Sequence, residues 1–255
     1  MIFLMNVGST VTYFGAAVSE NDIRYCSMQT VDTMTDLEFV LKFRAFLQES
    51  ELKPADFDRS VLSCVVPLLK EVLIRAMVRM FGHEPLLVDA SCAVNFSIGL
   101  RKKEELGANL IALTAAIVQE YGVPAILLNI GTATSFGVID GQAVYTGGVL
   151  YPGMQNALDA LIGRTSLPPI KIDAVYALSG KNTLDSIGAG VLYGHAGAVD
   201  RILDELLEIV PGARIVVSGK RGKILSSVLC HETVYDPVLP LKGLYVIARL
   251  KEEKA

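Results

Sequence analysis

The chain has 255 residues, of which 51% are hydrophobic and 20% are charged. This composition excludes an intrinsically disordered chain and a small disulfide-stabilised domain, because both contain far less apolar material for a core. The 23 Lys and Arg residues and the 27 Asp and Glu residues give a formal charge of −4 without any basic block, so no nucleic-acid partner and no anionic membrane surface is expected.

The first half of the chain is predicted to alternate strands and helices. Thr35 and Glu38 have the spacing of a capping box, in which both side chains accept hydrogen bonds from amides at a helix start. Pro67 favours the first position of another helix, and apolar residues then recur at helical spacing until Gly82. The expected elements are an apolar strand from residue 2 to a turn at 6–10, strands over 13–18 and 23–30, a helix over 35–50, a strand over 61–66, a helix over 67–82, a strand over 86–88 and a helix over 104–120.

The second half is predicted to follow a similar order. Its long helix contains four glycines, each of which costs up to about 1 kcal/mol of helix propensity. Such a sequence indicates that the helix packs closely against another lobe or another subunit. The glycines are Gly188, Gly190, Gly194 and Gly197. The expected elements are a strand meander from residue 125 through 148, helices over 154–162 and 183–210, a strand over 215–219 and a terminal helix over 241–252.

The two halves carry the same motif at the end of an apolar run. Asn6-Val7-Gly8-Ser9-Thr10 is matched by Asn129-Ile130-Gly131-Thr132-Ala133-Thr134, and a second strand-like segment follows each. Alternating strands and helices favour an α/β fold, and an internal repeat indicates two homologous lobes. We place these lobes at about residues 1–118 and 119–255.

Other functional classes receive little support from the sequence. No apolar run reaches the roughly 18 residues that a membrane span needs, and the apolar start lacks a basic leader, so we expect a buried strand there and no signal peptide. His83 and His231 are each followed by Glu but lack the second His of a zinc helix. The four cysteines lie far apart, which indicates reduced, buried thiols in a cytoplasmic protein. They are Cys26, Cys64, Cys92 and Cys230.

The two repeated turns have the chemistry of a phosphate site. Turns of this kind offer backbone N–H groups and hydroxyl groups to phosphate oxygens. One such turn is more often an ordinary hairpin, but its duplication at equivalent strand ends favours a pair of turns that face each other across a cleft. The hydroxyl groups belong to Ser9, Thr10, Thr132 and Thr134.

These motifs resemble those of the type III pantothenate kinases in the actin-like and sugar-kinase superfamily. The family's first turn has the pattern Asp-x-Gly-Asn-Thr, and its second has Asp-Phe-Gly-Thr-Ala-Thr. The resemblance covers nearly the whole chain and implies two ribonuclease-H-like lobes with a cleft between them. Further matches are Val65-Val66-Pro67, Gly147-Gly148 with Pro152-Gly153, Arg164-Thr165-Ser166-Leu167-Pro168 and Gly180-Lys181-Asn182-Thr183.

The resemblance also implies roles for individual residues. The family phosphorylates pantothenate with ATP on the route to coenzyme A, as a dimer that uses Mg²⁺ and a monovalent cation. Asn109 occupies the position of the family's catalytic base, and Asn129 that of an acid expected to hold a cation. The implied nucleotide and phosphate contacts are Asn6, Gly8, Ser9, Thr10, Gly131, Thr132, Thr134, Ser218 and Gly219. The implied substrate contacts are Gly107, Asn109, Leu110 and Thr183.

The charged groups of the family are missing at these positions. Similarity to the family would put acids at Asn6, Asn109 and Asn129, and the family's Gly-Ala-Asp-Arg here reads Gly107-Ala108-Asn109-Leu110. An amide cannot accept the substrate's hydroxyl proton near neutral pH, a role worth roughly 10² to 10⁴ in rate. Lys220 stands where the family's adenosine-binding turn has a second glycine. This combination indicates descent from an active kinase after selection for the acids was relaxed.

Three hypotheses follow from the sequence. The first is a type III pantothenate kinase-like protein that is impaired as a lone chain. The second is a non-catalytic subunit that pairs with an active paralogue, and the chain is expected to form either a homodimer or such a heterodimer. The third is a module that senses a nucleotide or pantothenate without turnover. The intact turns and the segment 164–168 favour the first two, whereas the Asn and Leu110 replacements favour the last two.

Overall fold

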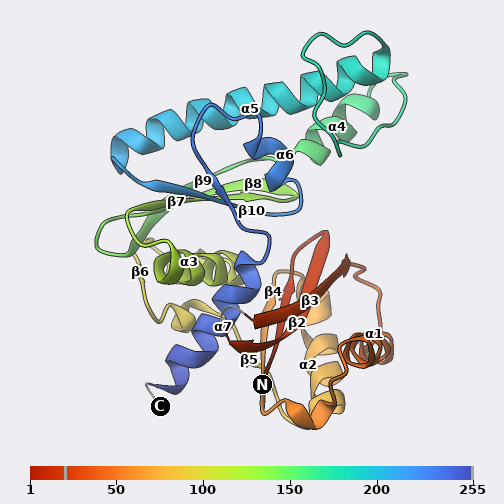
Figure 1. The fold of residues 1–255 in the computed structure, drawn as a ribbon, viewed down its shortest axis with the longest axis vertical. Coiled ribbons are helices and arrows are strands. Elements are labelled where there is room, and N and C mark those ends of the chain that lie inside the picture. The colour runs from red at the N-terminus through yellow and green to blue at the C-terminus, as the bar shows by residue number, and fades with distance from the viewer. Residues whose placement is uncertain (20–21, 254–255) are drawn as a thin grey trace. The chain divides into compact units, whose positions relative to one another are not determined.

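The computed structural model describes residues 1–19 and 22–253, which form two compact units (Figure 1). Unit 1 contains Met1–Glu120 and the C-terminal segment that begins at Val238, and unit 2 contains Tyr121–Pro237. Among the described residues, no helix has both the length and the apolar character that crossing a membrane requires.

Unit 1 is built on a five-stranded sheet with helices on both faces. The strand order is β3-β2-β1-β4-β5, in which β1 pairs antiparallel with β2 and parallel with β4. The strands are β1 (Ile2–Val7), β2 (Val11–Ser19), β3 (Asp22–Gln29), β4 (Arg59–Cys64) and β5 (Leu86–Leu87), with a further short strand β6 (Ser97–Ile98). The helices are α1 (Asp36–Glu49), α2 (Pro67–Phe81), α3 (Ala108–Glu120) and α7 (Leu239–Glu252), and 3₁₀ turns lie at Pro54–Asp56, Ala90–Cys92 and Lys103–Glu105.

The strands of unit 2 repeat this topology. Their order β9-β8-β7-β10-β11 has the same antiparallel pairs β9-β8 and β8-β7 and the same parallel pairs β7-β10 and β10-β11. The strands are β7 (Ala125–Ile130), β8 (Ala133–Ile139), β9 (Val144–Pro152), β10 (Arg214–Ser218) and β11 (Val234–Tyr235), and the helices are α4 (Met154–Ile162), α5 (Thr183–Ile209) and α6 (Gly222–Ser226). The predicted α/β class and internal duplication are therefore confirmed.

An aromatic core joins α1 and α2 to one face of the unit 1 sheet. Phe3 of β1 lies 5.0 Å from Phe43 of α1 and 4.6 Å from Phe81 of α2 between ring centroids. Phe14 of β2 packs edge-on against Phe43 and Phe46. Aromatic contacts of this geometry add to the stabilisation from burial alone. This core fixes β1, and with it the turn that follows β1.

The other face of the same sheet is covered by α7, which contacts β1, β2 and β4 and packs along α3 (Figure 1). The two helices approach at Gly243, where a β-carbon would lie 1.8 Å from the carbonyl oxygen of Ala112. An ion pair of 2.6 Å between Lys242 and Glu120 lies beside this contact. The absence of a side chain at Gly243 therefore allows α7 to join unit 1, although the expected second lobe ran to residue 255.

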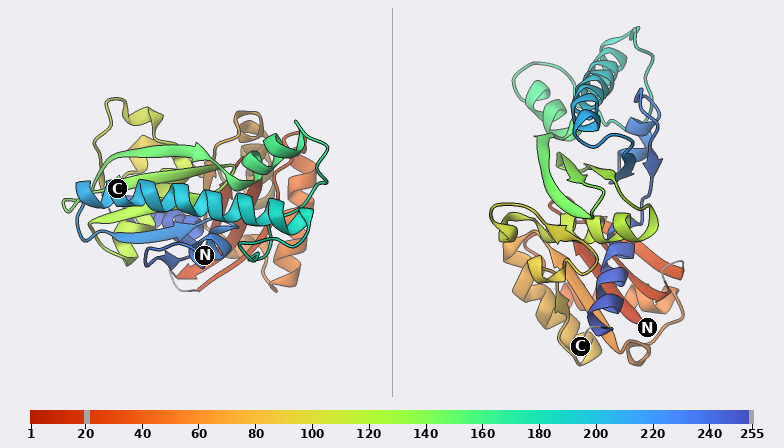
Figure 2. Two further views of the ribbon diagram at one scale, coloured as in Figure 1. Left: turned by 90° about the horizontal axis from the view of Figure 1, so that it is seen from above. Right: turned by 90° about the vertical axis from the view of Figure 1, so that its left-hand side faces the viewer.

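In unit 2, α5 lies across one face of the sheet (Figure 2). Its apolar residues Leu192, Val199 and Leu203 are buried in a cluster with residues of β7, β8 and β10. A β-carbon on Gly188 would lie 2.5 Å from the Tyr176 ring, so this glycine packs closely against a loop of its own unit, whereas another lobe or another subunit was the expected neighbour. The other three predicted glycines are exposed, and a β-carbon on any of them would meet no neighbouring atom of the described chain within 4 Å. They are Gly190, Gly194 and Gly197.

Most predicted elements are present, and the differences have local causes. The capping box of Thr35 and Glu38 is confirmed, and Gly82 ends α2 in the left-handed conformation. The helix expected from residue 104 instead begins at Ala108, after a 3₁₀ turn and an extended Leu106 that is buried in the core. The expected meander continues past residue 148 to the end of β9, and α6 and β11 were not predicted. Cys230 is exposed, although a buried thiol was expected.

We predict that Gly243→Ala destabilises the protein by about 2 kcal/mol, because the new methyl group would force α3 and α7 apart. Gly107→Ala is the matched control, since a β-carbon there has no atom of the described chain within 4 Å. Denaturant unfolding of both variants measures the difference. Equal stabilities for the two variants would contradict a backbone contact at Gly243.

Candidate functional site

The turn after β1 is held by backbone and hydroxyl hydrogen bonds. The Gly8 N–H donates to the Val11 carbonyl at 3.0 Å, and the Thr30 hydroxyl donates to the Gly8 carbonyl at 2.8 Å. Ser9 and Thr10 are exposed at the tip. The bond from Thr30 ties the turn to the end of β3, so the tip is presented by a fixed hairpin.

Asn6 is buried behind this turn. It pairs in register with Ser63 of β4, and its side chain is 4% exposed. Among the described residues, neither the Asn6 Oδ1 atom nor the Ser63 Oγ atom has a hydrogen-bond partner. Buried polar atoms normally have partners, so this pair stands out as an unsatisfied polar position directly behind the turn.

The corresponding turn of unit 2 is held by the start of α4. The Thr132 carbonyl accepts from the Gly153 N–H at 3.1 Å and from Asn156 Nδ2 at 2.9 Å. A β-carbon on Gly153 would lie 2.4 Å from the Gly131 carbonyl oxygen. Only glycine at position 153 therefore lets α4 begin directly against the turn.

The end of β10 closes the same region of unit 2. Asn129 of β7 is in register with Ser218, as Asn6 is with Ser63. Gly219 has a φ of +97°, and a β-carbon there would lie 2.2 Å from the Ile130 carbonyl oxygen. The turn after β7, the start of α4 and the end of β10 thus meet at one edge of the sheet, where backbone amides and hydroxyl groups could contact a phosphate.

Arg221 fixes the segment that follows Gly219. Its Nη2 atom donates to Gln155 Oε1 of α4 at 2.6 Å, and its Nε atom donates to the Ile172 carbonyl at 3.2 Å. The side chain of Arg221 therefore links the start of α6, α4 and the loop after α4. Sequence reasoning missed Arg221 and Asn156, because hydrogen bonds between distant segments leave no local pattern.

Thr134 is placed differently from the other hydroxyl residues. It is fully buried, and its Oγ1 atom shares a hydrogen bond of 2.9 Å with His195 Nε2 of α5. His195 is 4% exposed, and this burial lowers the pKa of its imidazole to about 4. In this structure, the Thr134 hydroxyl therefore stabilises the junction between β8 and α5, and the phosphate contact expected for it stays a prediction.

The expected substrate residues lie on two helix starts. Gly107, Asn109 and Leu110 are half-buried around the first turn of α3 in unit 1. Thr183 is exposed at the first position of α5 in unit 2, after Asn182, whose side chain accepts from the Asp185 N–H at 2.9 Å. Both groups are thus presented by rigid elements, and their roles in substrate binding stay a prediction.

Ser63 is a further residue that the sequence could have indicated. Leu62-Ser63-Cys64 at the end of β4 matches Val217-Ser218-Gly219 at the end of β10, and both serines are buried beside a repeated asparagine. The repeat motif therefore extends to a second strand in each unit.

Comparisons with known proteins agree with this geometry. The profile of the type III pantothenate kinase family matches residues 2–205. A type III pantothenate kinase from Bacillus cytotoxicus is 31% identical over 260 residues, which cover 100% of this chain and 99% of that relative. The chain belongs to the type III pantothenate kinase family.

Solved structures show that this family member has an actin-like fold. A conserved protein from Campylobacter jejuni gives a TM-score of 0.61 at 16% identity, covering 98% of this chain and 99% of that one. MreB 5 of Spiroplasma citri, bound to AMPPNP, gives a TM-score of 0.54 at 12% identity, covering 99% of this chain and 97% of that one. The predicted duplicated ribonuclease-H-like fold of the actin-like ATPases is thereby confirmed.

The residues of this family member provide a poor set of ligands for a metal ion. The described part of the chain has no cluster of three or more His, Cys, Asp or Glu side chains arranged around a metal position. Asn6 and Asn129 offer neutral amide oxygens, whereas Mg²⁺ is usually bound through carboxylates and substrate phosphates. The expected cation site at Asn129 therefore does not fit a metal held by the protein itself.

We predict that His195 makes the stability of this pantothenate kinase family member depend on pH. Its pKa is about 4 in the folded protein, against an ordinary value of 6.5. The unfolded chain therefore binds more protons between these values, so this contribution is complete above pH 6.5 and is lost as the pH falls toward 4. The loss approaches about 1.4 kcal/mol per pH unit.

The variant His195→Gln keeps a polar partner for Thr134 but cannot titrate. Denaturant unfolding at roughly pH 7, 6 and 5, which spans the window between the two pKa values, should show a shallower decline in its stability than in that of the unmodified protein. Parallel pH profiles for the two proteins would show that His195 is not the titrating group.

Proposed function

We propose that this chain acts in coenzyme A biosynthesis, as a protein of the ATP-dependent phosphorylation of pantothenate, and that it is impaired as a lone chain. Family membership supports the reaction class. The observation that carries the impairment is Asn109, a neutral amide on the first turn of α3 at the position of the family's base. The same replacement of acid by amide occurs at Asn6 and Asn129.

The retained groups are suited to binding phosphate. Gly8 directly follows β1 and Gly131 directly follows β7, and hydroxyl residues come after each of them. Backbone N–H groups and hydroxyl groups at such turns stabilise phosphate oxygens without any protein charge. Binding of ATP could therefore outlast the loss of the acids, with Ser9, Thr10 and Thr132 as the proposed contacts.

The groups that this chain lacks would contribute to the phosphoryl-transfer step itself. Phosphoryl transfer depends on positioning and on charge stabilisation, so loss of the base alone leaves some activity. Asn109 cannot take the hydroxyl proton of pantothenate, and Leu110 cannot provide a cationic contact. When bound, Mg²⁺ would neutralise charge on the phosphates, but the amides of Asn6 and Asn129 would contribute little to holding it.

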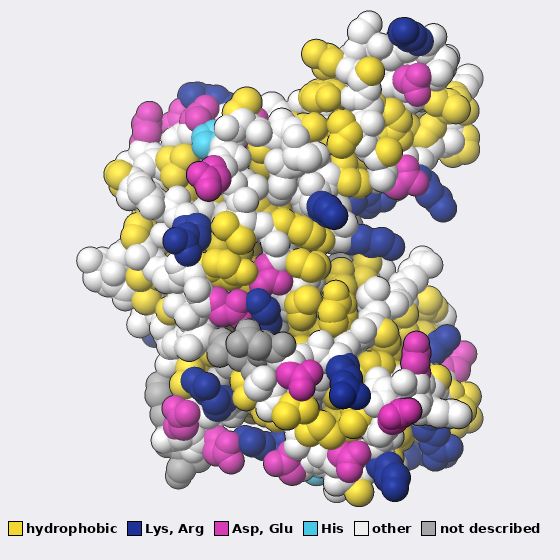
Figure 3. All heavy atoms as spheres, in the orientation of Figure 1, with side chains coloured by type: hydrophobic (Ala, Val, Ile, Leu, Met, Phe, Trp, Pro, Cys, Tyr) yellow, Lys and Arg dark blue, Asp and Glu magenta, His cyan; other side chains and the backbone are white. Residues whose placement is uncertain are grey.

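A second candidate is a subunit whose function lies in association. Unit 2 exposes hydrophobic side chains around α4, the end of β9 and the start of α5, a region where Figure 3 shows hydrophobic atoms gathered at the upper right. The exposed glycines of α5 follow directly along that helix. Contiguous exposed apolar surface is characteristic of interaction sites. The exposed side chains are Leu150, Leu161, Val175, Leu178 and Leu184.

We predict that the purified chain phosphorylates pantothenate at least roughly 10²-fold more slowly than an acid-bearing relative, because it lacks the base. Restoring Asn109→Asp alone should recover little. Restoring Asn6→Asp, Asn109→Asp, Asn129→Asp and Leu110→Arg together should recover more than the sum of the single changes, because groups that act as one catalytic unit are not additive. The test is the steady-state turnover of the unmodified chain and of each variant, with ATP, Mg²⁺ and a potassium or ammonium salt.

A chemically matched control tests whether the base is the cause. The variant that combines Asn6→Asp, Asn129→Asp and Leu110→Arg but retains Asn109 should stay slow, since it still lacks the proton acceptor. Ordinary turnover by the unmodified chain would refute the impaired-chain proposal. Turnover that appears only after co-expression with an acid-bearing homologue would support the subunit, and tight nucleotide or pantothenate binding without turnover in either case would support a sensor.

We also predict a dimer that buries more than roughly 1,000 Å² through α5 or α3. Gly194→Trp should convert it to a monomer, because a large side chain would block close approach at the exposed glycines of α5. Gly141→Trp, in the exposed β8–β9 turn, is the control and should leave the dimer intact. Sedimentation velocity at micromolar concentration gives the oligomeric state of the unmodified chain and of both variants. A monomeric unmodified chain would contradict the dimer proposal.

A further inference from the structure

Lys220 lies at the edge of the unit 2 sheet where the turn after β7, the start of α4 and the end of β10 meet. It directly follows Gly219, on which a β-carbon would lie 2.2 Å from the Ile130 carbonyl oxygen. Consecutive Cα atoms are about 3.8 Å apart, so the Lys220 Cα atom lies within roughly 8 Å of that oxygen. A lysine carries its ammonium group on a flexible four-carbon stem, which can therefore reach a phosphate bound at the turn that begins with Gly131.

The ammonium group of Lys220 has no counter-ion within the described chain. Its side chain is exposed, and it makes no ion pair with any residue that the structure describes. The Asp159 carboxylate of α4 instead accepts from Gln155 Nε2 at 2.8 Å. An ammonium group in this position is free to pair with an anionic ligand, and charge-assisted hydrogen bonds to phosphate oxygens are among the stronger ones.

The next residue, Arg221, holds the backbone beside Lys220 in place. Its guanidinium group donates to Gln155 Oε1 at 2.6 Å and to the Ile172 carbonyl at 3.2 Å. Both bonds fasten this segment to α4 and to the loop after α4. Arg221 is therefore used within the fold, whereas Lys220 presents a free charge from a fixed stretch of backbone.

The charge at this edge differs from that of a site built around a metal ion. Asn129 offers a neutral amide where a carboxylate was expected, and Lys220 brings a positive charge to a position where the family pattern has glycine. Carboxylates are what a protein uses to hold Mg²⁺ beside phosphates, whereas lysine binds phosphate itself as a point charge. Both differences therefore favour direct contact between the protein and a phosphate group.

We propose that Lys220 binds the phosphate groups of the nucleotide directly and supplies positive charge there in place of a metal ion held by the protein. This inference rests on the proposed function, because it requires that the chain bind ATP at the turn after β7. Nucleotide binding should then depend little on Mg²⁺, and the contribution of Lys220 should be confined to ligands that carry phosphate.

Calorimetric titration of the full chain with ATP, in Mg²⁺ and in EDTA, tests this proposal. The unmodified chain should bind ATP in EDTA with nearly the affinity that it has in Mg²⁺. Lys220→Ala should weaken ATP binding in EDTA roughly tenfold, the value of one hydrogen bond to a charged group. Lys220→Arg should retain the affinity because it keeps the charge, and Lys220→Ala should leave the affinity for adenosine unchanged.

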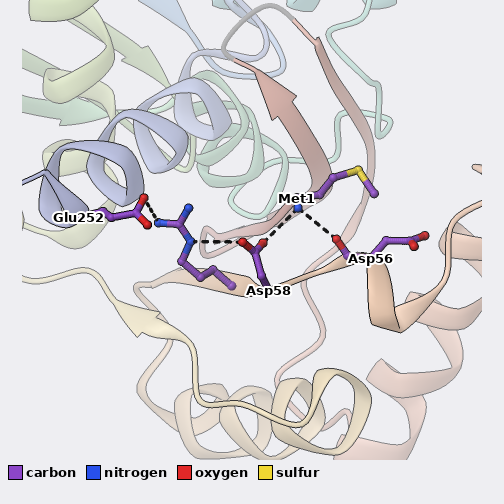
Figure 4. A network of polar contacts seen from close by, with 5 residues as sticks. Met1, Asp56, Asp58 and Glu252 are labelled. Atoms are coloured by element: carbon purple, nitrogen blue, oxygen red, sulfur yellow. Dashed lines mark hydrogen bonds and ion pairs between the residues drawn. The ribbon is translucent and has the colours of Figure 1, made fainter.

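Two further lysine variants are matched controls for the lost charge. Lys223→Ala removes an exposed lysine of the same segment, three residues further along in α6. Lys53→Ala removes an exposed lysine near the amino end of β1, where the Asp56 carbonyl accepts from the Met1 ammonium group at 3.0 Å (Figure 4). Both variants change the net charge as Lys220→Ala does, and both should leave ATP binding unchanged.

The role of Lys220 is overturned if ATP binds only in the presence of Mg²⁺, or if Lys220→Ala leaves the affinity in EDTA unchanged. It is also overturned if Lys223→Ala weakens ATP binding as much as Lys220→Ala, or if Lys220→Ala weakens adenosine binding equally. Each of these outcomes leaves the proposed function intact. Failure of the unmodified chain to bind ATP under either condition would contradict the proposed ATP-dependent function itself, and the role of Lys220 with it.

Discussion

The structure depends on places where one backbone segment lies directly against another, and glycine makes each of them possible. Gly219 lies against the carbonyl of Ile130, and Gly153 against that of Gly131, so β10 and α4 both close on the turn after β7. Gly243 lies against Ala112 and joins α7 to α3. A β-carbon at any of these positions would meet a carbonyl oxygen well inside its contact distance. The candidate phosphate turn and the position of the C-terminal helix therefore rest on the same constraint.

The two repeated turns combine glycine and hydroxyl residues with amides at the positions where the family resemblance led us to expect acids. Asn6 and Asn129 occupy equivalent strand positions beside Ser63 and Ser218, and amides can replace carboxylates there with little change of volume. What an amide cannot replace is the negative charge that would hold a cation, or the basicity that would accept a proton. The fold and the proposed reaction thus depend on different properties of the same positions.

Strand β1 links two regions of unit 1. The carboxyl end of β1 leads into the turn at Gly8, and its amino end lies beside Arg59 of β4. The aromatic core around Phe3 and Phe43 holds β1 rigidly between these two places. α7 contacts the same strand and packs along α3, whose first turn carries Asn109. The C-terminal helix therefore supports both the strand that leads into the turn at Gly8 and the helix that carries Asn109.

The sequence by itself determined the features whose causes are local. The capping box at Thr35, the left-handed stop at Gly82 and the repeated glycine turns each depend on residues a few positions apart, and the repeat predicted the duplicated topology. Tertiary structure alone decided the partners: His195 with Thr134, Arg221 with Gln155, and Lys242 with Glu120, 122 residues away. It also moved the start of the helix expected from residue 104 to Ala108, because Leu106 is drawn into the core in an extended conformation. Such contacts depend on which distant surfaces meet and can close without overlap, and no local pattern of residues encodes that.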